Sequence, residues 1–295
     1  MKILIIGCGL LGMKLYENLH KEKYDVYGTF YEHPIENDHC FRLDITKIRD
    51  VNHLINKISP DIIVHTSAVT NVDECERDRK KASSVNVQGT RNVVYAGEKI
   101  GATVVYISTD YVFDGEQGLY KEEERVNPIN YYGSTKLEGE KVVAGLCHHF
   151  IIARTSVLYG DRKNNFATWL VEKLQKEEDL TVVDDQFVSP TLNDDLAEQL
   201  IALFEADESG VFHTAGGERI SRYAFACMVA DVFDLDKSLI VSGHINDMKW
   251  AARRPKDSSL DISKISKIKK PYTVQQAVHL LKDEMSDRIS KDTLE

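Results

Sequence analysis

Short apolar runs alternate with segments of helical periodicity over the first half of the chain. The runs KILIIG, YDVYGTF, DIIVHT, ATVVYIS and FIIART are rich in β-branched residues, and their apolar positions are continuous rather than alternating. Continuous runs are typical of strands that are buried on both faces of a sheet. Polar periodic segments such as LLGMKLYENLHKE separate them, an order that indicates parallel strands with helices between them. We therefore predict an α/β fold with a doubly wound parallel sheet, a Rossmann domain, in residues 1–155.

The pattern loosens after residue 155. Helical periodicity is found around 164–177, 193–206 and 222–234, and the short runs LTVVD and GVFHT have the composition of strands. We predict that residues 156–285 form mainly a smaller C-terminal α/β lobe that binds substrate, with some segments returning to the Rossmann sheet. The polar end SDRISKDTLE predicts a frayed tail in residues 286–295.

Composition excludes several classes of function. The formal net charge of −10 and the pI near 5.5 argue against a nucleic-acid partner, because duplex binding usually needs a basic face. The five cysteines are odd in number and form no C-x-x-C pair, so neither a disulfide framework nor a metal site is expected. No apolar run approaches the length of roughly 18 residues that spans a bilayer, and the run after Met1 is too short for a signal peptide. A cytoplasmic protein without a membrane partner is expected.

The segment GCGLLG follows the first predicted strand and opens the first predicted helix. Gly7, Gly9 and Gly12 have the spacing of a dinucleotide-binding loop, in which glycines let the backbone approach a pyrophosphate at a helix N-terminus. Leu10 and Leu11 complete the candidate loop. A plain turn between strand and helix is the alternative.

The kind of dinucleotide is less clear from the residues. The second strand ends in GTFYEHP, which has neither a carboxylate at its tip for the ribose of NAD nor an arginine for the 2′-phosphate of NADP. Asp44 and Ile45, in RLDIT after a third strand, could contact the adenine, or Asp44 could cap the following helix. These residues leave the choice between NAD and NADP unresolved; NADP(H) is the first expectation and NAD(H) the alternative.

Polar residues follow the strand ATVVYIS. Ligands of open parallel sheets bind at the carboxyl ends of the strands, so Ser108, Thr109 and Asp110 are expected to face a crevice. Tyr132 and Lys136 come later, spaced i, i+4, and would share one face of a helix. A neighbouring ammonium favours the phenolate and should lower the pKa of the tyrosine, which suits acid-base chemistry.

The spacing Y-x-x-x-K is not specific by itself. Two other pairs have it: Tyr95 with Lys99, and Tyr159 with Lys163. The first lies in a helix that leads into a strand, and the second follows the last predicted strand of the Rossmann sheet. Only Tyr132 follows a strand that ends in Ser and Thr and opens a helix that returns to the sheet. Context therefore selects Tyr132 and Lys136.

Eight blocks in order resemble the dTDP-4-dehydrorhamnose reductase family of the extended short-chain dehydrogenase/reductase superfamily. The blocks are GCGLLG, LDIT, STDYVFDG, NPINYYGSTKLEGE, ARTSVLYG, DDQFVSPT, GVFHTAGGERISRYAFA and ARRPKDSSLD. The resemblance implies a catalytic set of Thr109, Tyr132 and Lys136, with Lys136 also touching the nicotinamide ribose. It further implies cofactor contacts from Ser67, Ala68 and Asn86, although Asn86 could instead be a structural amide.

The same resemblance implies a pocket for a nucleotide sugar. Its candidate residues are Ser108, Asp110, Tyr111, Val112, Asn164, Asn165, Gln186, Thr191 and Arg254. Arg254 is expected to clamp a diphosphate, because a guanidinium binds phosphate oxygens with two hydrogen bonds. A surface or capping role is the alternative for Asn164, Asn165, Gln186, Thr191 and Arg254. Val157 stands where bacterial rhamnose-forming members have Trp, and the glycine loop is one residue shorter than in most extended members, so the sugar stays open.

The resemblance implies NAD(P)H-dependent reduction of the 4-keto group of a nucleotide-linked 6-deoxy sugar. The specific expectation is conversion of dTDP-4-dehydro-L-rhamnose to dTDP-L-rhamnose, and a homodimer is the expected assembly. Two alternatives stay open. The chain is also similar to the regulatory beta subunit of methionine adenosyltransferase, which binds NADP and clasps an enzyme, or it could be a nucleotide-sugar epimerase or dehydratase.

Overall fold

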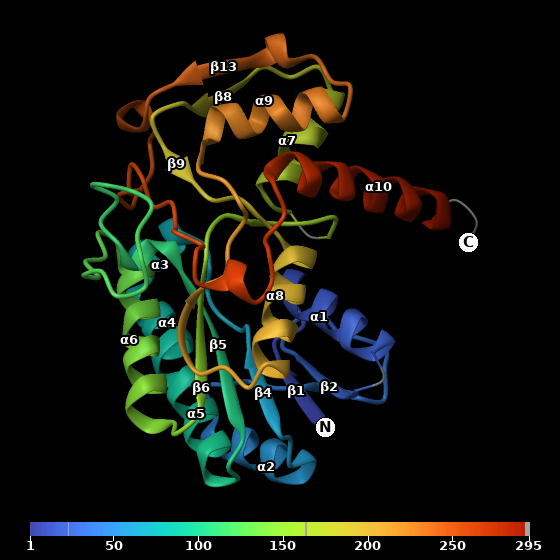
Figure 1. The fold of residues 1–295 in the computed structure, drawn as a ribbon, viewed down its shortest axis with the longest axis vertical. Coiled ribbons are helices and arrows are strands. Elements are labelled where there is room, and N and C mark those ends of the chain that lie inside the picture. Colours follow the sequence, from blue (N-terminus) through green and yellow to red (C-terminus); the bar gives the residue numbers. More distant parts are fainter. Residues whose placement is uncertain (23, 163, 293–295) are drawn as a thin grey trace.

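The computed structural model describes residues 1–22, 24–162 and 164–292 (Figure 1). Within them, one sheet has the order β11-β6-β5-β4-β1-β2-β3, and every neighbouring pair is parallel. Its strands are β1 (Lys2–Ile6), β2 (Asp25–Phe30), β3 (Cys40–Arg42), β4 (Ile62–His65), β5 (Thr103–Thr109), β6 (Phe150–Thr155) and β11 (Gly210–His213). The strand order reverses between β1 and β4, which is where such sheets bind ligands. The predicted doubly wound Rossmann sheet is confirmed.

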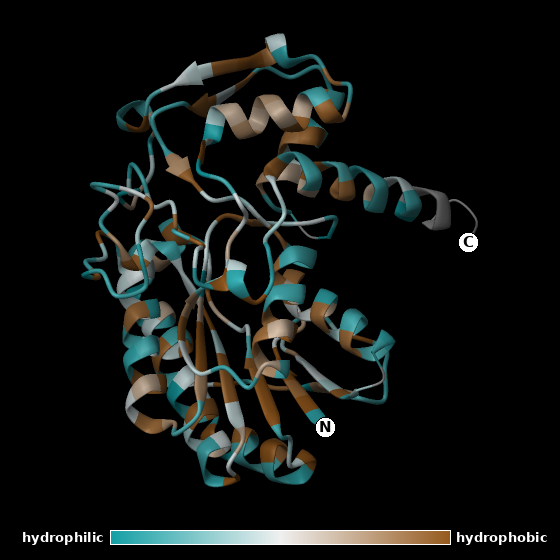
Figure 2. Ribbon diagram, in the orientation of Figure 1, coloured by the Kyte–Doolittle hydropathy of each residue, from teal (hydrophilic) through white to brown (hydrophobic). Residues whose placement is uncertain are grey.

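The helices of this part cover both faces of the sheet. They are α1 (Leu10–Lys21), α2 (Ile48–Ile58), α3 (Val72–Arg77), α4 (Arg79–Ser83), α5 (Thr90–Lys99), α6 (Tyr131–Leu146) and α8 (Asn193–Glu205), with a π-helical turn at Ser84–Gly89. Ile3 and Ile5 of β1 pack with α1 and α8, whereas Leu4 and Ile6 pack with α2 and α5. This alternation buries both faces of the strand and explains its continuous apolar run, which Figure 2 shows as hydrophobic colour along the central strands.

A second hydrophobic core lies beyond the carboxyl ends of the strands. It is built by α7 (Phe166–Gln175), α9 (Arg222–Val232) and α10 (Val274–Asp292), together with residues of β7 (Leu158–Tyr159), β8 (Leu180–Val183), β10 (Thr191–Leu192) and β13 (Ile240–Gly243). β9 (Phe187–Val188) pairs with β12 (Ile220–Ser221) in the same region. Figure 1 shows β8, β13, α7 and α9 above the large sheet. This second core places side chains opposite the strand tips, as a substrate lobe would require.

Two elements after residue 155 pack in the Rossmann part and not in the second core, and a third, α10, is longer than predicted. α8 packs against α1, and β11 extends the sheet next to β6, so both complete the Rossmann part. α10 continues to Asp292, and residues 286–292 are therefore helical rather than frayed, because a buried stripe of Val274, Val278 and Leu281 anchors the helix. Across the described ranges, no helix combines the length and the apolar character that crossing a membrane would need.

Candidate active site

The glycine loop lies between β1 and α1 and requires glycine at two positions. Gly7 has φ +103°, and a Cβ there would lie 2.3 Å from Ser67 Oγ. A Cβ on Gly12 would lie 2.2 Å from the carbonyl oxygen of Gly7. Gly9 is the N-cap residue of α1, and because glycine has no side chain it cannot cap the N–H groups of the first helical turn. The loop thus offers free backbone donors at a helix N-terminus, which fits a pyrophosphate.

The neighbouring candidates for cofactor contact differ in what they can offer. Ser67 and Ala68 follow β4 beside the loop, and the N–H of Ser67 donates to Ile6 O (2.9 Å). Leu10 is half-buried, but the side chain of Leu11 packs in the core, so only its backbone faces the loop.

The segment after β3 is held by its own contacts. Asp44 Oδ1 accepts hydrogen bonds from the backbone N–H (2.9 Å) and the hydroxyl (2.6 Å) of Thr46. The N-cap of α2 is Lys47, so Asp44 does not cap this helix by its side chain. Ile45 is buried against Gly89. The adenine contact predicted for Asp44 and Ile45 stays a prediction.

Asn86 lies in the π-helical turn and is fully buried. Its amide accepts from Val69 N (2.8 Å) and donates to Val69 O (3.0 Å) and to Thr135 Oγ1 (3.0 Å). Asn86 therefore joins the loop after β4 to helix α6, one residue before Lys136. The structure supports the structural role that the sequence left open for this amide.

Thr109, Tyr132 and Lys136 come together where β5 ends and α6 begins. Thr109 is the last residue of β5, and its Oγ1 hydrogen-bonds Asp110 Oδ1 (3.0 Å) and the N–H of Tyr111 (3.2 Å). The side chain of Tyr132, in the first turn of α6, lies close enough to Thr109 for the two groups to influence each other. Lys136 is buried one turn further along α6, and its Nζ lies 4.1 Å from the centroid of the Tyr106 ring. The sequence predicted this grouping from the order of the motifs.

The pKa shifts at this group differ from the sequence expectation. Burial raises the pKa of Tyr132, and the side chain of Thr109 only partly opposes the rise. Burial also lowers the pKa of Lys136 to about 7, against the attraction of Glu140. The expected lowering of the tyrosine pKa by the ammonium is therefore wrong for the free protein, because burial outweighs it. The consequence is a phenol that stays protonated at neutral pH and can donate a proton.

Lys136→Met should stabilise the free protein at pH 7. The folded pKa of about 7 lies below the value of 10.5 for an ordinary lysine, so the unfolded chain binds this proton more tightly. Lys136 therefore weakens folding below about pH 10.5, with the full effect reached below about pH 7. We expect the variant to raise the free energy of unfolding at pH 7 by about 1–3 kcal/mol, with the gain shrinking toward pH 10. Urea unfolding at several pH values measures this.

Lys141→Met is the matched control for that experiment. Lys141 lies on the same helix, is exposed, and pairs with Glu138 at 2.6 Å. Its loss should change the free energy of unfolding by less than about 1 kcal/mol. A Lys136→Met variant that is no more stable than the wild type at pH 7 would contradict the assigned burial cost.

Asp110 is held in a closed hydrogen-bond network. Its Oδ2 accepts from Ser156 Oγ (2.8 Å) and Ser258 Oγ (2.5 Å), and Oδ1 accepts from Thr109. Burial raises the pKa of this carboxyl, although the hydrogen bonds from Ser258, Ser156 and Thr109 oppose the rise. Asp110 thus links Thr109 to two serines from other parts of the chain and positions it.

The neighbours of Asp110 in sequence lie at different depths. Ser108 is buried and donates to Glu140 Oε1 (2.5 Å), beneath the catalytic group. Tyr111 packs edge to face on Tyr132, with ring centroids 6.2 Å apart. Val112 is fully buried in an apolar cluster, so its side chain cannot line an open pocket. Of the three, Tyr111 is the best placed to meet a substrate.

The candidates from the smaller part separate into two groups. Gln186 is buried beside the site, and its Nε2 donates to Tyr111 OH (3.4 Å) and Pro255 O (3.3 Å). Asn164 is exposed, and Asn165 caps α7 in a capping box with Thr168. Thr191 is fully buried, and its hydroxyl donates to Ser156 O (2.7 Å). The capping alternative accounts for the observed contacts of Asn165, whereas Thr191 is neither a surface nor a capping residue, and its substrate contact stays a prediction.

Arg254 is engaged by a carboxylate. Its Nη2 lies 3.1 Å from Asp73 Oδ2, its Nη1 donates to Asp73 Oδ1 (3.2 Å) and Ala252 O (2.8 Å), and the guanidinium lies over the Trp250 ring. This pair joins α3 to the segment after β13. A diphosphate would have to share the guanidinium with Asp73.

Sequence reasoning missed the buried ion pair below the site. Arg154 donates to Glu140 through Nε (2.9 Å) and Nη2 (2.8 Å), and both side chains are 6% exposed. Glu140 also accepts a hydrogen bond from Ser108 Oγ, and its negative charge attracts the ammonium of Lys136. Tyr132, Lys136 and Glu140 follow one another at intervals of four positions and so share one helix face, a signal that could have pointed to this pair.

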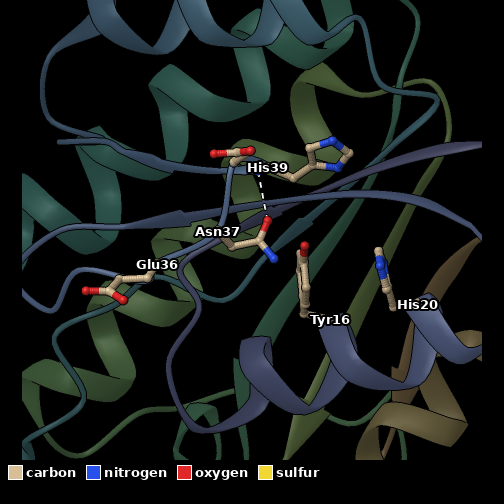
Figure 3. Close-up of a pocket in the computed structure, with 6 residues that line it drawn as sticks. Tyr16, His20, Glu36, Asn37 and His39 are labelled. Carbon is tan, nitrogen blue, oxygen red and sulfur yellow. Dashed lines mark hydrogen bonds between the residues drawn. The ribbon is translucent and has the colours of Figure 1, made fainter.

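Two polar features lie apart from this group. A cavity of about 660 Å³ is lined by Tyr16 and His20 of α1 and by residues 36–39 (Figure 3). It shares no residue with the catalytic candidates. Asp184, Asp185 and His244 have ligand atoms within 4.8 Å of one another, but Asp184 already bonds Ser242, and Asp185 accepts from Ile245 N. The expectation of no metal site stays a prediction.

The other two Tyr-Lys pairs do not form comparable sites. Tyr95 is exposed on α5, with Lys99 Nζ 4.4 Å from its ring centroid. Tyr159 is fully buried in the second core, and Lys163 lies outside the described residues. The structural context thus favours Tyr132 and Lys136, as the sequence argument proposed.

Known proteins match this chain along nearly its whole length. A model of the RmlD substrate binding domain family matches residues 1–286. The dTDP-4-dehydrorhamnose reductase of Aggregatibacter actinomycetemcomitans is 34% identical, over 90% of this chain and 92% of that protein. Methionine adenosyltransferase 2 subunit beta of Bos taurus is 33% identical, over 90% of this chain and 81% of its own length.

A solved structure agrees with these relatives. The dTDP-4-dehydrorhamnose reductase of Bacillus anthracis in complex with NADP has a TM-score of 0.89 and 32% sequence identity, covering 96% of this chain and 99% of its own. The fold, the ordered motifs and these matches together show that the chain belongs to the dTDP-4-dehydrorhamnose reductase family.

Proposed function

We propose that the protein reduces the 4-keto group of a nucleotide-linked 6-deoxy sugar, with dTDP-4-dehydro-L-rhamnose as substrate and NADP(H) preferred over NAD(H). The observation that carries the proposal is the grouping of Thr109, at the carboxyl end of β5, with Tyr132 and Lys136 on the first turns of α6. The family relatives named as reductases, and the NADP complex of one of them, support the reaction and the cofactor.

The glycine loop fits a dinucleotide. Gly7 and Gly12 leave a backbone cradle that any Cβ would fill, and the first turn of α1 presents its N–H groups to it. Ser67 and Ala68 would border the cradle, and Lys136 would reach the nicotinamide ribose. When bound, the reduced cofactor supplies the hydride that reaches C4 of the sugar.

The chain's own residues supply the proton and hold the reacting oxygen. Tyr132 donates its phenolic proton to the sugar O4 as hydride arrives at C4, so the ketone becomes an alcohol and the tyrosine a phenolate. Its raised pKa keeps the phenol protonated before the step. Thr109 is held in place by Asp110, and it would orient the O4 oxygen once its single hydroxyl hydrogen turns from Asp110 Oδ1 toward O4. Lys136 stabilises the phenolate by its charge, and solvent then returns the proton to Tyr132.

The contacts of Asp110 weigh against a dehydratase. An acidic residue beside the catalytic threonine could act as a general acid, but Asp110 is 2% exposed and its oxygens accept from Ser156, Ser258 and Thr109. A carboxylate held in this way serves to position Thr109. The reductase therefore accounts for these contacts better than the dehydratase alternative.

The decisive test is the loss of reduced nicotinamide absorbance when the purified protein meets dTDP-4-dehydro-6-deoxy-L-mannose. NADPH and NADH are compared in parallel, and faster oxidation of NADPH is expected. Binding of NADPH without any oxidation would reject the reductase. It would direct attention to the regulatory role of the methionine adenosyltransferase relatives, for which co-purification with a methionine adenosyltransferase is the corresponding assay.

A further inference from the structure

Arg222 is the first residue of α9 and is fixed beside the candidate active site. Its backbone N–H donates to Gln186 O (2.9 Å), and Ser221 caps the helix by accepting from Ala224 N (3.1 Å). Ser221 also pairs with Phe187 where β12 meets β9. The start of α9 is therefore held against the strand that follows Gln186.

The guanidinium of Arg222 forms no ion pair among the residues that the structure describes, and the carboxylate of Asp110, which attracts it, already accepts from Thr109, Ser156 and Ser258. It lies over the ring of Phe166, 5.0 Å from the centroid, and its Nε is buried without a hydrogen-bond partner. A buried donor without a partner is costly, and a cation at a helix N-terminus faces the positive end of the helix dipole. The position of this charge is thus unfavourable unless an anion joins it.

Two other arginines of the same region show the contrast. Arg219 Nη2 lies 2.6 Å from Asp257 Oδ2, and Arg254 Nη2 lies 3.1 Å from Asp73 Oδ2. Both charges are compensated within the chain. Arg222 has no such carboxylate within ion-pair distance in the described ranges, so its charge is available to a ligand.

The charge of Arg222 acts on the side chains beside the catalytic tyrosine. Gln186, whose backbone it contacts, hydrogen-bonds Tyr111 OH, and the Tyr111 ring packs on Tyr132. Burial raises the pKa of Tyr111, and the positive charge of Arg222 is the largest influence that opposes this rise. Arg222 therefore lies near the side chains that surround Tyr132, although it comes from the smaller part of the chain.

We propose that Arg222 binds the diphosphate of the nucleotide-sugar substrate, an inference that rests on the proposed function. A diphosphate carries the negative charge that this guanidinium lacks, and a planar guanidinium can bind two of its oxygens at once. The pyrophosphate of the dinucleotide is held elsewhere, at the glycine loop and the start of α1. Arg222 thus determines affinity for the substrate and leaves binding of the cofactor unchanged.

Substitution of Arg222 separates these two affinities. Arg222→Gln should raise KM for the nucleotide sugar by about 10- to 100-fold, whereas Kd for NADPH stays within about twofold. Arg222→Lys should recover part of the loss, because it restores the charge without the paired donors. Arg91→Gln is the matched control, since Arg91 is exposed on α5, and neither constant should change.

Direct binding identifies the group that Arg222 contacts. Calorimetric titration with dTDP and with thymidine should give tighter binding of dTDP to the wild type. Arg222→Gln should lose about 10- to 100-fold in affinity for dTDP and little for thymidine. Titration with UDP and GDP extends the test to other nucleoside diphosphates.

The possible results discriminate clearly. An active Arg222→Gln variant with unchanged KM and unchanged dTDP affinity would overturn the inference, as would equal losses for dTDP, thymidine and NADPH, or a wild type that binds none of these diphosphates. If the wild type binds a nucleoside diphosphate through Arg222 but reduces no sugar, the proposed reaction fails and the diphosphate site stands.

Discussion

Tyr132→Phe should lower kcat for sugar reduction by about 10²- to 10⁴-fold, the range by which a positioned proton donor accelerates a reaction. The phenylalanine ring keeps the edge-to-face contact with Tyr111, so the pocket retains its shape. Phenylalanine has no hydroxyl group and therefore no proton to donate. In the wild type, the raised pKa of Tyr132 keeps its proton available at neutral pH. Oxidation of NADPH under substrate saturation measures the effect, and fluorescence titration checks that NADPH still binds.

Tyr95→Phe is the matched control for this substitution. Tyr95 and Lys99 have the same spacing as Tyr132 and Lys136, and Lys99 also lies over an aromatic ring. Tyr95 is exposed on α5, however, and faces no strand tip. Its substitution should leave kcat unchanged. A Tyr132→Phe variant that keeps its rate to within about tenfold of the wild type would mean that another group donates the proton.

The sequence was sufficient to predict the sheet and the grouping of Tyr132 and Lys136, for a physical reason. A strand buried on both faces must be apolar at every position, as β1 is, and polar residues at its end then indicate a crevice. Tyr132 and Lys136 share a helix face, so their proximity follows from spacing alone. These features depend on local geometry, which a sequence contains.

Features that depend on tertiary pairing were not accessible in the same way. The amphipathic pattern of α8 predicts a helix but does not say which core it packs against, and the structure places it on α1. Asp73 and Arg254 are far apart in the chain, so nothing in the sequence indicated that the predicted diphosphate clamp already has a carboxylate. The sequence likewise does not indicate that Arg222 forms no ion pair with a carboxylate among the described residues.

The pKa values belong to this second class. The spacing of Tyr132 and Lys136 suggested a lowered tyrosine pKa, because two residues at positions i and i+4 of a helix are neighbours and the ammonium would lie close to the phenol. Burial of both side chains reverses the outcome, because it disfavours every charged form. Burial is set by the elements that cover α6, including the segment near Asn86, and not by the motif itself.

Glu140→Gln should lower the free energy of unfolding by about 3–5 kcal/mol, since it removes the charge that compensates a buried arginine. Arg154 would keep only the neutral amide and the carbonyl oxygen of Glu122, to which its Nη1 donates at 3.2 Å. Ser108 would also lose its carboxylate acceptor. Thermal unfolding should show a fall in Tm of about 10 °C. Glu138→Gln, which breaks the exposed pair with Lys141 on the same helix, should cost less than about 1 kcal/mol.

The double variant Glu140→Gln, Arg154→Met distinguishes the cause of that loss. If the uncompensated charge is responsible, replacing Arg154 by an apolar side chain of similar length removes it, and the double variant should be more stable than Glu140→Gln alone. A double variant that is as unstable as the sum of both single changes would show that the two side chains contribute independently. The pair would then stabilise the contact between β6 and α6 through packing. The charge of Glu140, which also interacts with Ser108 and Lys136, would not need Arg154 to balance it.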